Sequence, residues 1–119
     1  MNLIETHEDL SPRSAGRIMT TKFPAINHDL SIAEVENLLL KNAKNLETID
    51  YIYVTDSQKK LLGVLSVKEV FRLPKNTSIE TVMKKELVTV RPHTDQERVA
   101  LIAIEHNLKE IPVVDSENR

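Results

Sequence analysis

Cysteine is absent from this chain of 119 residues, and glycine occurs only twice. The lack of cysteine excludes disulfide bonds and thiolate chemistry. With two glycines the chain cannot form the glycine-rich loop that holds phosphate in many nucleotide-binding proteins. No apolar run is long enough to cross a bilayer, so direct membrane insertion of this chain is not expected. The first ten residues are acidic and lack the apolar stretch of a signal peptide.

An excess of positive charge is also missing. The chain carries 16 Lys and Arg residues against 18 Asp and Glu residues, which gives a net charge of -2. This balance provides no electrostatic surface for nucleic acid, so a nucleic-acid partner is not expected. The hydrophobic content of 40% and the charged content of 29% are typical of a soluble globular protein, and we expect a cytoplasmic location.

Two stretches of the chain repeat one another. Met19 aligns with Met83, Ile26 with Val90 and Val35 with Val99, at a constant spacing of 64 residues. The sequences IYVTDS, at residues 52–57, and IPVVDS, at residues 111–116, occupy matching places further along the two copies. Apolar positions match apolar positions almost throughout, so the chain is interpreted as two copies of one supersecondary unit.

Each copy has the sequence pattern of a β-α-β-β-α unit. Short apolar runs predict strands at residues 23–26 and 87–90, and in the first copy also at 51–54 and 62–65. The spacing S/T-x-x-E, in which a hydroxyl and a carboxylate cap each other's backbone N–H groups, marks four predicted helix starts. These starts lie at residues 31–34, 66–69, 77–80 and 94–97. The apolar face of the first long helix is predicted to comprise Ile32, Val35, Leu38 and Leu39.

A unit of about 55 residues buries too little apolar surface to be stable alone. The two copies are therefore expected to pack sheet to sheet with pseudo-twofold symmetry, as a mixed α/β (α+β) fold. We divide the chain into an N-terminal connecting segment (1–16), a first repeat (17–76) and a second repeat (77–119). The second repeat lacks a counterpart of residues 62–73 and is expected to be incomplete at its C-terminus. The resulting open sheet edge favours a homodimer.

The runs IMTTKF and VMKKEL, the two strands ending in Asp-Ser, and the segment LGVLSVKEV resemble a CBS-domain pair, or Bateman module. The runs SAGRIMTTKFPAI and HTDQERVA narrow the resemblance to the cytosolic CBS region of MgtE-type magnesium transporters. The resemblance covers about residues 14–119. It implies a homodimeric regulatory module that responds to Mg²⁺ at the cytoplasmic face of the membrane. The N-terminal helical domain and the transmembrane domain of such a transporter would be its partners.

The resemblance also implies a site for ATP or another adenosine nucleotide. A ribose needs a carboxylate for its hydroxyls, an adenine needs an apolar slot, and a phosphate suits a helix N-terminus. Alternatively, the tyrosine and the valines belong to the core and the glutamate completes a capping box. The residues implied for this site are Tyr51, Ser66, Lys68, Glu69, Val88 and Val90.

Asp95 matches an acidic position that coordinates Mg²⁺ between the N-terminal and CBS domains of this family. Magnesium prefers carboxylate oxygen and retains several waters. The opposing carboxylates would come from the N-terminal domain, so this chain supplies half of such a site. Alternatively, Asp95 is a carboxylate in the first turn of a helix, where it favours the helix dipole.

Two functions remain open from the sequence. One is a Mg²⁺-responsive gating module of an MgtE-type transporter, and the other is a stand-alone nucleotide-sensing CBS protein that regulates an enzyme. An enzymatic activity is not expected, because the chain shows no nucleophile elbow, metal cluster or acid/base pair.

Overall fold

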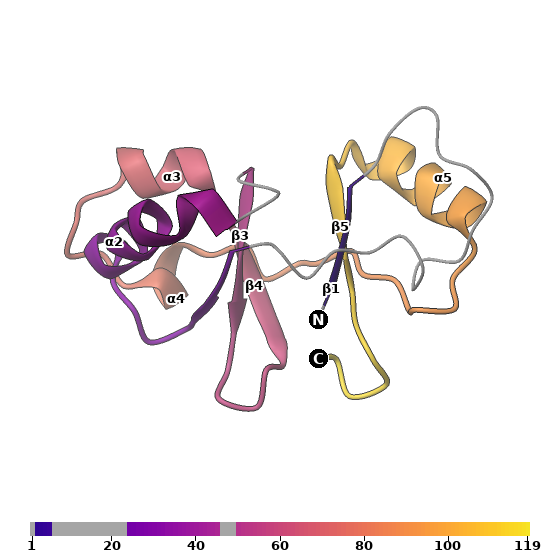
Figure 1. The fold of residues 1–119 in the computed structure, drawn as a ribbon, viewed down its shortest axis with the longest axis horizontal. Coiled ribbons are helices and arrows are strands. Elements are labelled where there is room, and N and C mark those ends of the chain that lie inside the picture. The colour runs from indigo at the N-terminus through magenta and orange to yellow at the C-terminus, as the bar shows by residue number, and fades with distance from the viewer. Residues whose placement is uncertain (1, 6–23, 46–49) are drawn as a thin grey trace. The chain divides into compact units, whose positions relative to one another are not determined.

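The chain forms two compact units in the computed structural model, which describes residues 2–5, 24–45 and 50–119. The first-copy unit comprises residues 22–87 (Figure 1). The second-copy unit combines the two ends of the chain, residues 1–21 and 88–119. Residues 77–87 therefore pack with the first copy. The predicted boundaries of the repeats, 17–76 and 77–119, describe sequence similarity and not compact units, so they stay a prediction.

The first-copy unit contains the predicted β-α-β-β-α order. Its elements are β2 (Ala25–Asn27), α2 (Ile32–Asn42), the 3-10 turn η1 (Ala43–Asn45), β3 (Tyr51–Thr55), β4 (Leu61–Ser66), α3 (Val67–Arg72) and α4 (Ile79–Val82). The sheet has the order β2-β3-β4, in which β2 is parallel and β4 antiparallel to β3. Helices α2 and α3 lie on the same side of this sheet (Figure 1).

The core of the first-copy unit lies between these helices and the sheet. Strand β3 is central, and its residues Ile52 and Val54 are fully buried. On α2 the predicted apolar face holds for Ile32 and Val35, which are fully buried, and for Leu39, which packs against the cluster. It is wrong for Leu38, which is 40% exposed. Position 38 lies at the margin of the helical stripe, and Leu38 does not belong to the cluster that packs against the sheet.

The second-copy unit contains β1 (Asn2–Glu5), α5 (Gln96–His106) and β5 (Glu110–Val113). Strand β1 pairs antiparallel with β5, and Val90 forms a parallel bridge to Val113 on the other side. The core of this unit consists of Val90, Val99, Ala103, Ile111 and Val113. The apolar residues of the second long helix predict a face of Val99, Ile102 and Ala103. Val99 and Ala103 are buried, and Ile102 is partly buried and packs against this cluster.

The predicted strand at residues 87–90 is wrong, and Pro112 gives the reason. In the first copy the Tyr53 N–H donates to the Pro24 carbonyl at 3.0 Å, which extends the pairing of β2 with β3. Pro112 is the counterpart of Tyr53 and has no N–H to donate to the counterpart carbonyl, that of Val88. The next two bonds of the ladder do form, from the Val90 N–H to the Pro112 carbonyl at 3.0 Å and from the Val114 N–H to the Val90 carbonyl at 2.9 Å. The second copy therefore has an isolated bridge between Val90 and Val113 where the first copy has strand β2.

One of the four predicted capping boxes is confirmed. Ser31 caps α2, and the Ser31 hydroxyl and the Glu34 carboxylate each bond the other's backbone N–H. The box at residues 66–69 is wrong, because the Ser66 side chain makes no cap hydrogen bond to α3. The box at 77–80 is also wrong, since α4 begins after Ser78, whose side chain likewise makes no cap bond.

The fourth predicted box, at residues 94–97, is wrong by one residue. Asp95 caps α5 and accepts the Glu97 N–H at 3.0 Å. The Thr94 hydroxyl instead accepts the Arg91 N–H at 3.1 Å, one turn earlier. The aspartate is the better N-cap of the two adjacent residues, because it also brings negative charge to the helix N-terminus.

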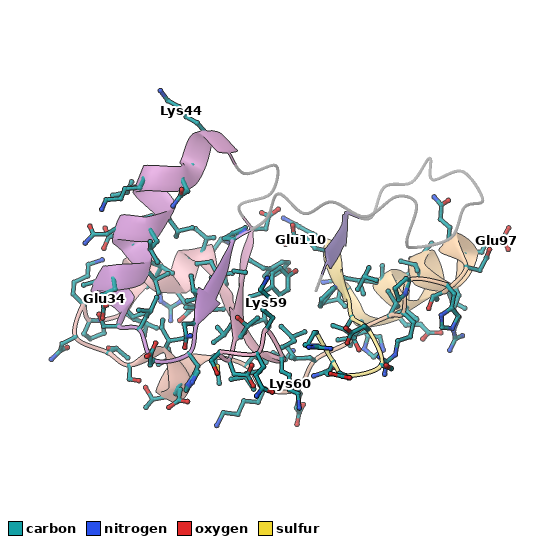
Figure 2. All side chains as sticks on the ribbon, turned by 60° about the horizontal axis from the view of Figure 1, so that its bottom comes forward. Glu34, Lys44, Lys59, Lys60, Glu97 and Glu110 are labelled. Carbon is teal, nitrogen blue, oxygen red and sulfur yellow. The ribbon has the colours of Figure 1, made fainter. Side chains whose placement is uncertain are left out.

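The repeated Asp-Ser sequences form the same turn in both copies. The Asp56 carboxylate accepts the N–H groups of Gln58 and Lys60, and the Asp115 carboxylate accepts the N–H groups two and four residues further on. The fourth residue of each turn has a left-handed backbone, with φ of 65° at Lys59 and 66° at Asn118. Figure 2 labels Lys59 and Lys60 in the first of these turns. The sequence repeat is therefore also a repeat of hydrogen bonds.

Candidate nucleotide and magnesium sites

Four of the six predicted nucleotide residues lie at the junction between β4 and α3. Tyr51 and Ser66 are directly opposite one another in the antiparallel pairing of β3 with β4. Ser66 is the last residue of β4 and also the N-cap of α3. The Val67 N–H donates to the Asp50 carbonyl at 3.1 Å and holds the start of α3 beside the start of β3. Lys68 and Glu69 follow in the first turn of α3, so these four residues form one local group.

Several polar groups of this junction are not engaged in helix capping. The Ser66 hydroxyl makes no cap bond, and the Lys68 side chain is exposed. The Glu69 carboxylate lies 3.6 Å from an Arg72 guanidinium nitrogen, in a pair whose arginine is exposed and whose glutamate is partly buried. A pair of this kind is worth little and yields readily to another partner. A hydroxyl, an ammonium group and a carboxylate thus lie within one strand-to-helix connection.

The remaining two predicted residues, Val88 and Val90, belong to the second-copy unit. Val90 is only 4% exposed and lies in the apolar cluster of that unit. Its N–H bonds the Pro112 carbonyl, and its carbonyl accepts the Val114 N–H at 2.9 Å. Both its side chain and its backbone are therefore used by the fold. Val88 is half-buried and precedes this bridge.

The predicted magnesium residue, Asp95, is exposed at the N-terminus of α5. One of its oxygens accepts the Glu97 N–H, which leaves the second carboxylate oxygen for another partner. Glu97 is also exposed, as Figure 2 shows at the start of α5. Among residues 24–45 and 50–119, no three His, Asp or Glu side chains are grouped so that they could hold a metal ion. A Mg²⁺ ion at Asp95 would need ligands from elsewhere.

One polar contact was not expected from the sequence. The His28 Nδ1 atom lies 2.5 Å from a carboxylate oxygen of Glu80, and so the loop after β2 is tied to α4. The two residues are 52 positions apart. The same two segments are joined through their backbones, since the Ile79 N–H donates to the Leu30 carbonyl at 3.0 Å. No local spacing in the sequence signals such a pair.

The CBS domain family model matches residues 15–76 and 79–119. The chain therefore belongs to the CBS domain family, and it is a CBS-domain pair with the mixed α/β fold expected from its repeats. Among curated proteins it is similar to the magnesium transporter MgtE of Thermus thermophilus, with 37% identity over 105 residues. The corresponding MgtE of Enterococcus faecalis is 31% identical over 102 residues. The resemblance to MgtE-type transporters is confirmed.

The extent of these matches defines what part of a relative the chain represents. The match to the Thermus protein covers 88% of this chain but only 23% of that protein. The match to the Enterococcus protein covers 86% of this chain and 22% of that protein. A solved structure of the cytosolic domain of the Mg²⁺ channel MgtE in complex with ATP matches with a TM-score of 0.87 and 37% identity. That match covers 89% of this chain and 43% of the other. No helix in the described part of the chain is long and apolar enough to cross a membrane.

Proposed function

We propose that this chain is the regulatory CBS module of an MgtE-type Mg²⁺ transporter or channel and takes part in its Mg²⁺-dependent gating. The observation that carries this proposal is the similarity to MgtE proteins through both CBS copies, at 37% identity over 88% of the chain. The module acts at the cytoplasmic face of the membrane. Its role is binding and gating rather than catalysis.

Gating by a bound ion requires that the ion favours one of two conformations. Carboxylates from separate domains suit this task, because they repel one another until a cation lies between them. In this proposal Asp95 supplies the carboxylate of the CBS module. Its exposed position and its second, uncapped oxygen are compatible with that role. The opposing ligands come from the N-terminal helical domain of the parent transporter.

An adenosine nucleotide modulates this gating in our proposal. The ATP complex of the similar cytosolic domain supports the idea. The group at the β4–α3 junction supplies polar contacts: Glu69 to the ribose hydroxyls and Lys68 to phosphate, with the Ser66 hydroxyl beside them. Tyr51 supplies apolar surface for the base. Val88 and Val90, which belong to the second-copy unit, stay in the proposal as the apolar residues that the resemblance implies. The module works as a homodimer joined to the helical and transmembrane domains.

The test for the magnesium role is Mg²⁺ influx through the full-length transporter at high cytosolic Mg²⁺. Asp95→Asn retains a good N-cap but removes the charge, whereas Asp95→Ala removes both. Both variants are expected to weaken closure of the channel by Mg²⁺ and to leave its open-state flux unchanged. Glu97→Gln, at an exposed carboxylate two residues away, is the matched control. If Asp95→Asn closes as the unmodified protein does, Asp95 acts only as a helix cap.

The nucleotide role is tested on this chain by following backbone amide signals during titration with ATP, ADP and AMP. Shifts are expected at Tyr51, Ser66, Lys68, Glu69 and Val88. Lys68→Ala should weaken the response to ATP more than Lys60→Ala, which removes an exposed lysine from the β3–β4 turn at the other end of the hairpin. Shifts centred on residues 111–115, or none at millimolar nucleotide, would remove the nucleotide site from the proposal.

A further inference from the structure

The segment that follows α3 folds back over the N-terminus of α2. The first N–H groups of a helix have no partner inside the helix. Here the Ile32 N–H donates to the Thr77 carbonyl at 2.9 Å, and the Ala33 N–H donates to the Lys75 carbonyl at 3.0 Å. Residues 75–80, which we call the return segment, therefore complete the start of α2 with their own backbone.

The return segment is also anchored by an apolar side chain. Ile79 is fully buried in the core of the first-copy unit. Its N–H donates to the Leu30 carbonyl at 3.0 Å, and Ser78 forms an antiparallel bridge with Ser31. Glu80 follows directly on this anchor, so its carboxylate is held beside the loop between β2 and α2.

That loop presents a histidine to Glu80. The His28 Nδ1 atom lies 2.5 Å from a Glu80 carboxylate oxygen, and the His28 N–H donates to the Thr55 carbonyl at 3.1 Å. The backbone bond ties His28 to the last residue of β3, so the imidazole and the carboxylate meet from two separately anchored segments. Their side chains are 34% and 52% exposed, which leaves the pair open to protons from solvent.

Carboxylates act on His28 from two different elements. Glu80 belongs to α4, and Asp56 belongs to the β3–β4 turn. The Lys60 N–H is the main cause that lowers the pKa of Asp56, and the charges of Lys60 and His28 act in the same direction. Asp29 is the next residue of the loop and is exposed. A positive charge on the imidazole is therefore attracted by both Glu80 and Asp56, against the single ammonium group of Lys60.

We infer that His28 is a proton-binding site, and that its charged form fastens the return segment to the start of α2. A neutral imidazole donates one hydrogen bond to the Glu80 carboxylate, whereas a charged imidazole donates the same bond and adds the attraction of opposite charges. Histidine changes its charge between about pH 5 and pH 8. The ligand of this site is the proton. The inference requires neither Mg²⁺ nor nucleotide, so it goes beyond the proposed function.

The experiment measures amide hydrogen exchange in the full chain at about pH 7.5 and about pH 6, on either side of the ordinary histidine range. Protection factors, corrected for the pH dependence of exchange itself, are compared. The amides of Ile32 and Ile79 bond between the start of α2 and the return segment. Their protection is expected to rise about threefold at the lower pH, as a partly exposed pair gains charge. The Tyr53 amide, which bonds within the sheet, should change less.

Equal protection of Ile32 and Ile79 at both pH values would overturn the inference. So would an equal change at all three amides, because the proton would then act on the whole unit and not on the return segment.

Three substitutions identify the groups responsible. His28→Gln keeps an amide donor but cannot change its charge, and Glu80→Gln keeps an acceptor but removes the negative charge. Both should abolish the rise in protection at Ile32 and Ile79. His106→Gln, at an exposed histidine of α5, is the matched control and should retain the rise. A rise that persists in His28→Gln would contradict a proton-binding site at this residue.

A measurement on the unmodified chain remains decisive if either variant is destabilised. The ring carbon signals of His28 report the charge of the imidazole, and the amide signal of Ile79 reports the return segment. Both are followed through a pH titration, and their curves are expected to superimpose. An Ile79 amide signal that does not follow the His28 ring signals would contradict the inference.

Discussion

Gly63 lies directly against Met83, so that a methyl group on Gly63 would stand 2.7 Å from the Met83 sulfur and 3.1 Å from the Lys84 carbonyl oxygen. The backbone cannot move aside easily, because the N–H groups of Val64 and Lys84 each donate to the other residue's carbonyl, at 3.0 and 2.8 Å. Strand β4 is therefore closely packed at Gly63, where the chain following α4 crosses it. The conflict is one of space, since a methyl group on Gly63 would displace the Met83 side chain and crowd the Lys84 carbonyl.

Gly63→Ala is accordingly expected to destabilise the first-copy unit by about 1–3 kcal/mol, which is typical of overpacking a filled core. Urea unfolding of both chains measures the difference. The double variant Gly63→Ala/Met83→Ala is the control, because it removes most of the atoms in conflict. The double variant should lose less unfolding free energy than the sum of the losses measured for Gly63→Ala and Met83→Ala. Strict additivity would show that Met83 is not the cause.

Lys59 and Asn118 offer a reciprocal test of the repeated turn. Both have left-handed backbones, a conformation that asparagine adopts more readily than lysine. Lys59→Asn is expected to stabilise the first-copy unit by roughly 0.5–1 kcal/mol. Asn118→Lys should destabilise the second-copy unit by a similar amount. Denaturation midpoints that move in the same direction for both variants would contradict a backbone origin.

The two turn aspartates should make stability depend on pH in the acid range. The N–H of Lys60 lowers the pKa of Asp56 below its usual value of 3.8, and the N–H of Arg119 does the same for the pKa of Asp115. A carboxyl with a lowered pKa binds a proton less readily in the folded chain than in the unfolded chain. The stability that it adds is therefore complete above pH 3.8 and is lost as the pH falls through the folded pKa.

Asp56→Asn and Asp115→Asn are each expected to flatten the dependence of the unfolding free energy on pH between about pH 5 and pH 2. Denaturant unfolding at several pH values measures the slope. Parallel curves for the variants and the unmodified chain would mean that these carboxylates titrate alike in the folded and unfolded states.

The features that the sequence predicted correctly depend on neighbours in the chain. The capping box between Ser31 and Glu34 needs only a three-residue spacing, and the buried positions Val99 and Ala103 follow from helical periodicity. The cap of α5 was missed because Thr94 and Asp95 are adjacent acceptors and only Thr94 has a glutamate three residues later, Glu97. The choice between them depends on the preceding turn, where Thr94 bonds Arg91.

Long-range pairing explains the remaining differences. The pairing of Ile4 with Ile111 joins opposite ends of the chain, and no local pattern marks the N-terminus as part of the second copy. The missing strand before Val90 could have been read from the sequence, since Pro112 stands where the first copy has Tyr53. For the candidate nucleotide site, the repeat aligns Val90 with Ile26, and both side chains are buried in the cores of their units. The grouping of Tyr51 with Ser66 required the register of β3 and β4.

Ser31 and Ser66 are the N-caps of α2 and α3, but only the Ser31 hydroxyl bonds its helix. Ser31→Ala is therefore expected to cost about 1 kcal/mol of unfolding free energy. Ser66→Ala should change it by less than about 0.5 kcal/mol, because no cap bond is lost. Urea unfolding of the two variants measures both effects. Equal losses would contradict this assignment of the caps.

The same pair of serine variants connects stability to the nucleotide proposal. A hydroxyl that does not serve its own helix is available to a ligand, so Ser66→Ala should weaken the amide shifts that ATP induces at Lys68 and Glu69. Ser31→Ala should leave those shifts unchanged in a chain that is still folded, because α2 begins outside the β4–α3 junction. If Ser66→Ala responds to ATP as the unmodified chain does, the Ser66 hydroxyl does not contribute to nucleotide binding.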